Sequence, residues 1–170
     1  MSHRDGNGHV VSTSGEWLFG RYGAAGVLLA APGPDGGPSV LLQRRACWTD
    51  HGGTWGIPGG AVDSDETPPA AALRELREET CIWGRQVVPR AQVVTKTAEL
   101  LDGGRWAYTT VIAITSHQLT AVGGLESEAL AWVPLPAVTK LRLHPGLAAS
   151  WGHLAALVAK ISSGTRQETI

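Results

Sequence analysis

Apolar stretches separated by turn-forming clusters fill most of the chain, and this pattern predicts strands. Residues 22–31 are almost entirely apolar and predict a buried strand, although their alanines would also suit a helix. A Pro- and Gly-rich turn at residues 31–39 joins this stretch to a second predicted strand at residues 40–45, so an antiparallel hairpin is expected. Residues 87–101 and 105–116 are β-rich and flank an Asp-Gly-Gly turn, which predicts a second hairpin.

Two other stretches have the periodicity of helices. Thr67 can cap a helix whose first turn contains two prolines and whose following residues, up to Thr80, are mostly strong helix formers. Residues 146–161 repeat apolar side chains at helical spacing and predict a second, amphipathic helix. Strands interleaved with two helices, without an internal repeat, predict an α/β or α+β fold.

The length of the chain, 170 residues, suits a single compact domain, which we place at residues 17–162. Residues 1–16 are polar and predict a flexible N-terminal arm, with an added edge strand as the alternative. Residues 163–170 predict a polar tail. The N-terminus lacks the apolar stretch of a signal peptide, and no run approaches the roughly 20 apolar residues of a membrane span. A cytoplasmic protein without a membrane partner is expected.

Composition and charge exclude several classes of protein. Hydrophobic residues make up 43% of the chain and charged residues 17%, which is ordinary for a globular domain. Fourteen basic and fifteen acidic residues nearly cancel, so an extended nucleic-acid surface is not expected. Cys47 and Cys81 have no zinc-binding spacing, and two free thiols in a reducing compartment are the better interpretation than a disulfide.

The predicted helix around residue 75 concentrates negative charge. Glu75, Glu78 and Glu79 stand at i, i+3 and i+4, which spreads three carboxylates over roughly 100° of one helix face. At about 6 Å and an effective dielectric near 20, each pair repels by roughly 3 kcal/mol. Arg74 and Arg77 can relieve part of this, and a hard divalent cation such as Mg²⁺ or Mn²⁺ relieves more. The alternative is a solvated helix face with intrahelical ion pairs.

The wider spacing favours the metal hypothesis. Gly60, five residues, Glu66, seven residues and then Arg-Glu-Leu-Arg-Glu-Glu at residues 74–79 closely resemble the signature of the Nudix hydrolases, the MutT-like family. That signature is G-x5-E-x7-R-E-U-x-E-E-x-G-U, where U is aliphatic. One fixed position differs, because Cys81 stands where the family has glycine. The resemblance extends over residues 22–151, most of the chain.

This resemblance implies an α/β/α sandwich with a mixed β-sheet between helices. It also implies Mg²⁺-dependent hydrolysis, with Mn²⁺ as the other metal, of a nucleoside diphosphate linked to a further group. The first choice of substrate is a (deoxy)nucleoside triphosphate, cleaved to monophosphate and pyrophosphate as in the removal of damaged nucleotides. The alternatives are a nucleotide sugar or another diphosphate, and a catalytically weak nucleotide-binding sensor. The partner is thus a small nucleotide; a homodimer is left open.

The resemblance also assigns roles within the signature. Glu75, Glu78 and Glu79 match the metal-binding glutamates, one of which also activates water. Arg74 matches an arginine that orients a catalytic glutamate. The backbone carbonyl of Gly59 matches a further metal ligand. Gly60 and the carboxylate of Glu66 match positions with supporting roles.

Outside the signature, Glu126 lies six residues before a tryptophan, where several family members place a further metal ligand or general base. Glu128 is an equal contender. Either could instead be a surface charge.

Substrate contacts are less well defined by the sequence. Arg44 and Arg45 end a predicted strand where an arginine contacts base or phosphate in some triphosphate-cleaving members. Trp55 could stack on a base, as could Trp48 and Trp106, but tryptophan is more often part of a core. Thr97 stands where members acting on ADP-ribose often have proline, which weakly favours a triphosphate.

Cys81 raises a separate question about the end of the helix. Glycine at this position would adopt the left-handed conformation that often ends helices. Because cysteine resists that conformation, we expect the helix end to shift towards Gly84. None of the metal-binding glutamates is touched, so activity should survive.

Overall fold

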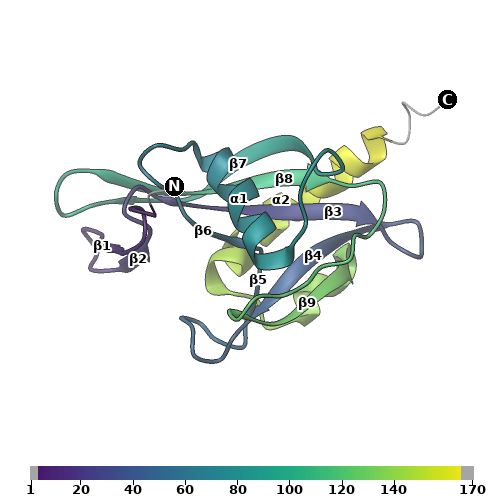
Figure 1. Ribbon diagram of the computed structural model, residues 1–170, viewed down its shortest axis with the longest axis horizontal. Helices are drawn as coiled ribbons and strands as arrows, with labels where there is room; N and C mark the ends of the chain where they lie inside the picture. The colour runs from purple at the N-terminus through teal and green to yellow at the C-terminus, as the bar shows by residue number, and fades with distance from the viewer. Residues whose placement is uncertain (1–3, 166–170) are drawn as a thin grey trace.

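The computed structural model describes residues 4–165 as a mixed β-sheet covered by a helix on each face (Figure 1). In chain order the elements are β1 (His9–Val11), β2 (Trp17–Phe19), β3 (Ala24–Pro32), β4 (Pro38–Arg45), β5 (Trp55–Gly56), β6 (Gly59–Ala61), α1 (Pro68–Thr80), β7 (Val88–Glu99), β8 (Arg105–Ile114), β9 (Ser127–Pro134), the 3₁₀ helix η1 (Leu135–Lys140) and α2 (Pro145–Thr165).

The main sheet has seven strands and its centre is β3. Along the sheet the order is β5, β4, β3, β8 and β7, while β6 pairs with β3 and β9 with β4. Strand β3 runs parallel to β8 and antiparallel to β4 and β6. Both predicted hairpins, β3–β4 and β7–β8, are therefore confirmed, and so is the mixed sheet.

Two hydrophobic cores hold the layers together. On one face, Ala71, Ala72 and Leu76 of α1 pack against β3 and β8. On the other face α2 contributes large buried side chains, namely Leu147, Trp151, Leu154 and Val158. The alternation of strand residues between the two cores explains why β3 is apolar throughout, because a central strand covered on both faces has no exposed side. No helix within the described residues is long and apolar enough to cross a membrane.

The N-terminal segment departs from the expected flexible arm at residues 4–16. Strands β1 and β2 form a two-stranded antiparallel sheet, and Ser12 forms a bridge to Leu100 at the end of the β7–β8 hairpin. Backbone hydrogen bonds hold this segment, and the polar composition of a segment does not predict such bonds. The predicted tail also begins later than expected, since α2 continues to Thr165; residues 1–3 and 166–170 lie outside the described part.

The expected shift of the helix end towards Gly84 is wrong. Helix α1 ends at Thr80, and Cys81 itself takes the left-handed conformation, with φ 58° and ψ 17°. Its N–H donates to the carbonyl of Arg77 at 2.9 Å. The hydroxyl of Thr80 accepts a hydrogen bond from the N–H of Ile82, whose side chain is buried in the core. Burial of Ile82 and closure of the cap offset the local cost at Cys81.

Candidate functional site

The candidate site lies where α1 passes β6. Thr67 caps α1 by accepting from the N–H of Ala70 at 3.4 Å, as predicted. The helix buries a narrow stripe against β3, and of the three glutamates Glu75 and Glu79 lie beside this stripe, facing β6. Two consecutive glycines of β6 then meet two of these glutamates: a Cβ on Gly60 would lie 2.6 Å from the carboxyl carbon of Glu75, and the N–H of Gly59 donates to Oε2 of Glu79 at 2.8 Å. Glycine at position 60 is thus required by close approach rather than by backbone conformation.

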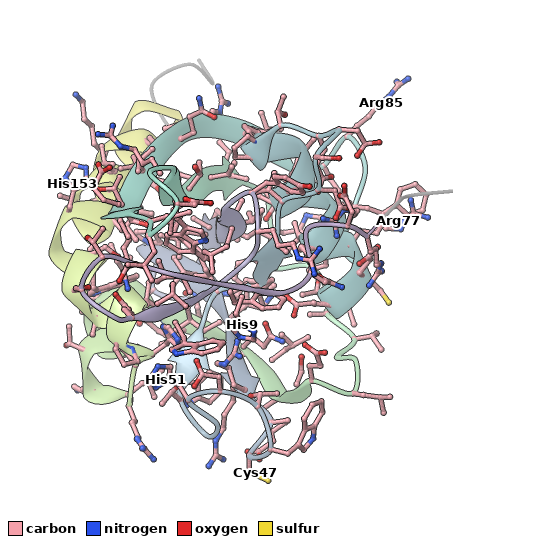
Figure 2. The ribbon with its side chains drawn as sticks, turned by 90° about the vertical axis from the view of Figure 1, so that its left-hand side faces the viewer. His9, Cys47, His51, Arg77, Arg85 and His153 are labelled. Carbon is pink, nitrogen blue, oxygen red and sulfur yellow. The ribbon has the colours of Figure 1, made fainter. Side chains whose placement is uncertain are left out.

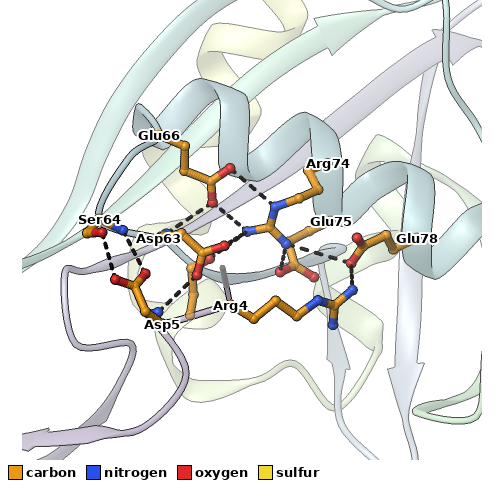
Figure 3. A network of polar contacts seen from close by, with 10 residues as sticks. Arg4, Asp5, Asp63, Ser64, Glu66, Arg74, Glu75 and Glu78 are labelled. Carbon is orange, nitrogen blue, oxygen red and sulfur yellow. Dashed lines mark hydrogen bonds and ion pairs between the residues drawn. The ribbon is translucent and has the colours of Figure 1, made fainter. Parts of the chain in front are cut away.

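Arg74 is the centre of a polar network on this helix (Figure 3). Its Nη1 donates to Oε1 of Glu75 at 2.6 Å, while its Nη2 donates to the carbonyl of Ala61 at 2.9 Å. Oε2 of Glu78 lies 3.6 Å from Nη1. The hydrogen bonds that Arg74 donates to Glu66 and Glu75 raise the pKa of Arg74 against the effect of burial, so this side chain stays charged. The predicted orienting arginine does contact a glutamate of the signature.

Glu66 holds Arg74 from the opposite side. Nη2 and Nε of Arg74 donate to its two carboxylate oxygens at 2.5 and 3.2 Å, and the N–H of Asp63 donates to Oε1 at 3.1 Å. Burial works to raise the pKa of Glu66, but these hydrogen bonds lower it overall. Buried Asp63 also lies 3.9 Å from Arg74. These contacts are compatible with the supporting role predicted for Glu66.

Burial gives Glu75 and Glu79 higher pKa values than ordinary surface carboxylates have. It raises the pKa of Glu75, with Arg74 opposing and Glu78 adding to the increase. Burial raises the pKa of Glu79 further, to about 7, against the hydrogen bonds from Gly59 and Gln43. The negative charges of Glu75 and Glu126 add to this rise. A carboxyl with these properties exchanges protons near neutral pH or becomes a strong ligand for a cation.

Gln43 and Tyr108 line the site from the sheet side, and the sequence did not single out either as a site residue. Nε2 of Gln43 contacts Oε1 of Glu79 at 3.3 Å and donates to Oγ of Ser127 at 2.7 Å. A Cβ on Gly59 would lie 3.0 Å from the hydroxyl of Tyr108, and the charge of Glu79 helps raise the pKa of that hydroxyl. A glutamine in the middle of a buried apolar strand was the available signal for Gln43.

The structure separates the two candidate carboxylates of the β9 region. Glu128 accepts a hydrogen bond from the N–H of Cys47 at 2.9 Å and lies 3.4 Å from Nε of Arg44. The negative charge of Glu126 instead makes a small contribution to the raised pKa of Glu79. Glu128 is therefore engaged at the loop after β4, and Glu126 stays the candidate for the signature glutamates.

The predicted substrate contacts lie around the end of β4. Arg44 pairs with Glu128, and Nε of Arg45 donates to the carbonyl of Asp50 at 2.8 Å. Trp55 packs against the core on the α2 side. Trp106 is buried and donates Nε1 to the carbonyl of Gly20 at 2.9 Å, so it is a core residue. No hydrogen bond or ion pair recorded for the described residues joins Arg44, Arg45 or Trp55 to the signature glutamates.

Arg77 does not offset the glutamates as Arg74 does. Its guanidinium lies over the ring of Trp83, 5.2 Å from the centroid, and points outward from α1 (Figure 2). The expected relief of carboxylate repulsion therefore comes from Arg74, joined by a second arginine from far along the chain. Nη2 of Arg4 donates to Oε2 of Glu78 at 2.7 Å, and nothing in the sequence pattern pointed to this contact.

The donor set fits a hard divalent cation. Glu75, Glu78 and Glu79 offer carboxylate oxygens from one helix face, and the burial that raises two of their pKa values is the condition that a bound cation relieves. Within residues 4–165, no three acidic, histidine or cysteine side chains converge into a ready-made cage. Figure 3 shows arginines on carboxylate oxygens of Glu75 and Glu78.

The chain is similar to known proteins of one family. Residues 21–152 match the family model described as NUDIX domain. A Mycobacterium tuberculosis protein named "Putative 8-oxo-dGTP diphosphatase 3" is 53% identical over 150 residues, which cover 88% of this chain and 69% of that protein.

Solved structures have the same architecture. A Nudix hydrolase from M. smegmatis, RenU, superposes with a TM-score of 0.88 at 47% identity, covering 92% of this chain and 97% of the other. A C. elegans Ap4A hydrolase, seen as a binary complex, has a TM-score of 0.64 at 20% identity, covering 82% and 98%. The second likeness concerns the fold alone.

Proposed function

Because this chain belongs to the Nudix hydrolase family, we propose that it hydrolyses a (deoxy)nucleoside triphosphate to the monophosphate and pyrophosphate. The observation that carries the proposal is the partly buried Glu79, held by Gly59 on the same helix as Glu75 and Glu78. The name of the M. tuberculosis relative makes 8-oxo-dGTP the first substrate to test. The cytoplasm, which keeps exposed thiols such as Cys47 and Cys81 reduced, is the proposed location.

We propose Mg²⁺ as the metal, with Mn²⁺ as a substitute, held by Glu75, Glu78, Glu79 and the carbonyl of Gly59. Glu126 is proposed as an additional ligand or base because its charge acts on Glu79. When bound, the cation neutralises charge on the diphosphate and lowers the pKa of coordinated water.

The protein's own groups supply position and proton transfer. Arg74 fixes the carboxylate of Glu75, and Glu66 and the carbonyl of Ala61 fix Arg74. Glu79 is the proposed proton acceptor for the attacking water, since burial raises its pKa to about 7 against the hydrogen bonds from Gly59 and Gln43. The attack is in line with the departing phosphate.

The nucleotide itself is proposed to contact residues at the end of β4. Arg44 and Arg45 carry positive charge there, and Trp55 lies opposite Arg44 in the strand pairing. Arg44 can contact a base or phosphate only if it leaves its partner Glu128. Their ion pair is exposed and therefore costs little to break.

The experiment is a mass-spectrometric product assay with Mg²⁺ and a panel of dNTPs, 8-oxo-dGTP, nucleotide sugars and dinucleoside polyphosphates. Monophosphate and pyrophosphate from a triphosphate are expected, with 8-oxo-dGTP ranked first. Turnover confined to nucleotide sugars or dinucleotides would overturn the triphosphate assignment. Binding of a nucleotide without cleavage would replace it with a sensor function.

A further inference from the structure

The N-terminal segment places a cation on the catalytic helix. Nη2 of Arg4 donates to Oε2 of Glu78 at 2.7 Å (Figure 3). The side chain of Arg4 remains 57% exposed. Among the interactions recorded for the described residues, Glu78 is the only ion-pair partner of Arg4.

The segment carrying Arg4 is fixed by its neighbours. Asp5 accepts hydrogen bonds from the N–H and the hydroxyl of Ser64 at 3.0 and 2.6 Å. The N–H of Gly6 donates to Oδ1 of Asp63 at 2.9 Å, and its carbonyl accepts from the N–H of Arg21 at 2.8 Å. Four hydrogen bonds thus hold two residues immediately after Arg4.

Gly6 shows that this docking is close. A Cβ at this position would lie 2.1 Å from the carbonyl oxygen of Val62, a contact that no side chain permits. Asp63, which accepts the hydrogen bond from Gly6, belongs to the loop that also supports Glu66 and Arg74. The segment is therefore built onto the same loop as the catalytic network.

Stability alone does not account for this arrangement. An exposed ion pair such as Arg4–Glu78 contributes little to folding. Arg74 already lies 3.6 Å from Glu78 and pairs with Glu75, so the helix has an internal cation without Arg4. Arg4 lies at the outer edge of the glutamates that are proposed to bind metal. A ligand that brings further negative charge to this place explains the position of Arg4 better.

We propose that Arg4 is a phosphate-binding residue of the active site, which exchanges the carboxylate of Glu78 for the diphosphate of the substrate. A guanidinium fork fits phosphate oxygens as it fits carboxylate oxygens, and a half-exposed side chain can change partner without moving its anchored backbone. The inference rests on the proposed function in taking the glutamates of α1 as a metal site and a diphosphate as the ligand.

The test measures binding of inorganic pyrophosphate with Mg²⁺ by calorimetry. Arg4→Ala is expected to weaken pyrophosphate binding about tenfold, and Arg4→Lys to weaken it less because the charge is kept and the fork is lost. Mn²⁺ alone, followed by electron paramagnetic resonance, should bind Arg4→Ala at least as tightly as the wild type, because Arg4 no longer competes for Glu78.

Arg105→Ala is the matched control, since Arg105 is also exposed and pairs with a glutamate, Glu99, at 3.0 Å at the far end of the β7–β8 hairpin. It should bind pyrophosphate like the wild type. Wild-type pyrophosphate affinity in Arg4→Ala, an equal loss in Arg105→Ala, or an equal loss of Mn²⁺ affinity in Arg4→Ala would each overturn the inference. If no triphosphate is cleaved but Arg4→Ala loses pyrophosphate, the proposed function fails and this inference stands.

Discussion

Helices α1 and α2 cover opposite faces of one sheet, yet they use different residues to do so. The apolar residues that α1 buries against β3 are two alanines and Leu76. Helix α2 buries larger side chains, among them Trp151 and Leu154. Small side chains let a helix approach a sheet closely, whereas large ones remove more apolar area from water. The first interface sets the distance between glutamates and β6, and the second supplies stability.

Replacing Glu79 with a neutral side chain should give the largest loss of activity and leave folding intact. For Glu79→Gln we expect kcat to fall by roughly 10²–10⁴-fold, because a proton acceptor and an anionic ligand are lost together. The measurement is turnover of the substrate that the product assay identifies, with thermal melting as the check on folding. Glu99→Gln, at the exposed pair with Arg105, is the control and should keep full activity. A kcat within threefold of the wild type would show that Glu79 is not the acceptor.

Shortening a buried side chain of α2 should instead lower the stability and leave the activity unchanged. Leu154 is fully buried, so Leu154→Ala is expected to lower the free energy of unfolding by about 2–5 kcal/mol. Urea denaturation measures this, and kcat well below the melting temperature should stay within about twofold. Leu125→Ala is the control because Leu125 is 94% exposed, and its effect should stay within about 0.5 kcal/mol. A comparable loss of activity in Leu154→Ala would mean that the two helices are not separable in this way.

The stability of the metal-free protein should depend on pH through Glu79. Its pKa rises from an ordinary 4.5 to about 7 on folding, so the folded state holds the proton more tightly. The resulting stabilisation is complete below pH 4.5 and is lost as the pH rises through 7. Compared with Glu79→Gln in EDTA, the wild type should lose roughly 1–3 kcal/mol between pH 5 and pH 8.

In the same denaturation series, the contribution of Glu66 to stability should depend on pH in the opposite direction. Its pKa is lowered on folding, so its contribution is present above its ordinary value and is lost on acidification. Parallel pH curves for the wild type and Glu79→Gln would contradict the assignment of the raised pKa to Glu79.

The smallest effect is expected at Cys81. Glycine adopts the left-handed conformation without the steric cost that a Cβ brings, so Cys81→Gly should stabilise the protein by about 0.5–1 kcal/mol. Turnover should stay within about twofold, because no site residue moves. Cys47→Gly is the matched control, as Cys47 is exposed but has no positive φ. A tenfold change in turnover in Cys81→Gly would show that the helix end acts on the site.

Sequence reasoning succeeded where spacing alone carries the information. The helix cap at Thr67 and both hairpins follow from local pattern. The end of α1 did not, because the intrinsic preference of Cys81 was outweighed by the burial of Ile82, a tertiary effect. The contact of Arg4 with Glu78 joins segments far apart in sequence through backbone anchors, which no local pattern records.

The pairing of β3 with β8 has a consequence for how the site is assembled. Ala24 pairs with Tyr108 in parallel, and Gly26, two residues further along β3, pairs with both Gly59 and Thr110. Non-local strand pairs of this kind form late, since the intervening chain must first close a long loop. During synthesis the glutamates of α1 leave the ribosome before β8 does. The newly made chain therefore carries the signature for some time before it can hold the catalytic geometry, which is completed only when the β7–β8 hairpin docks.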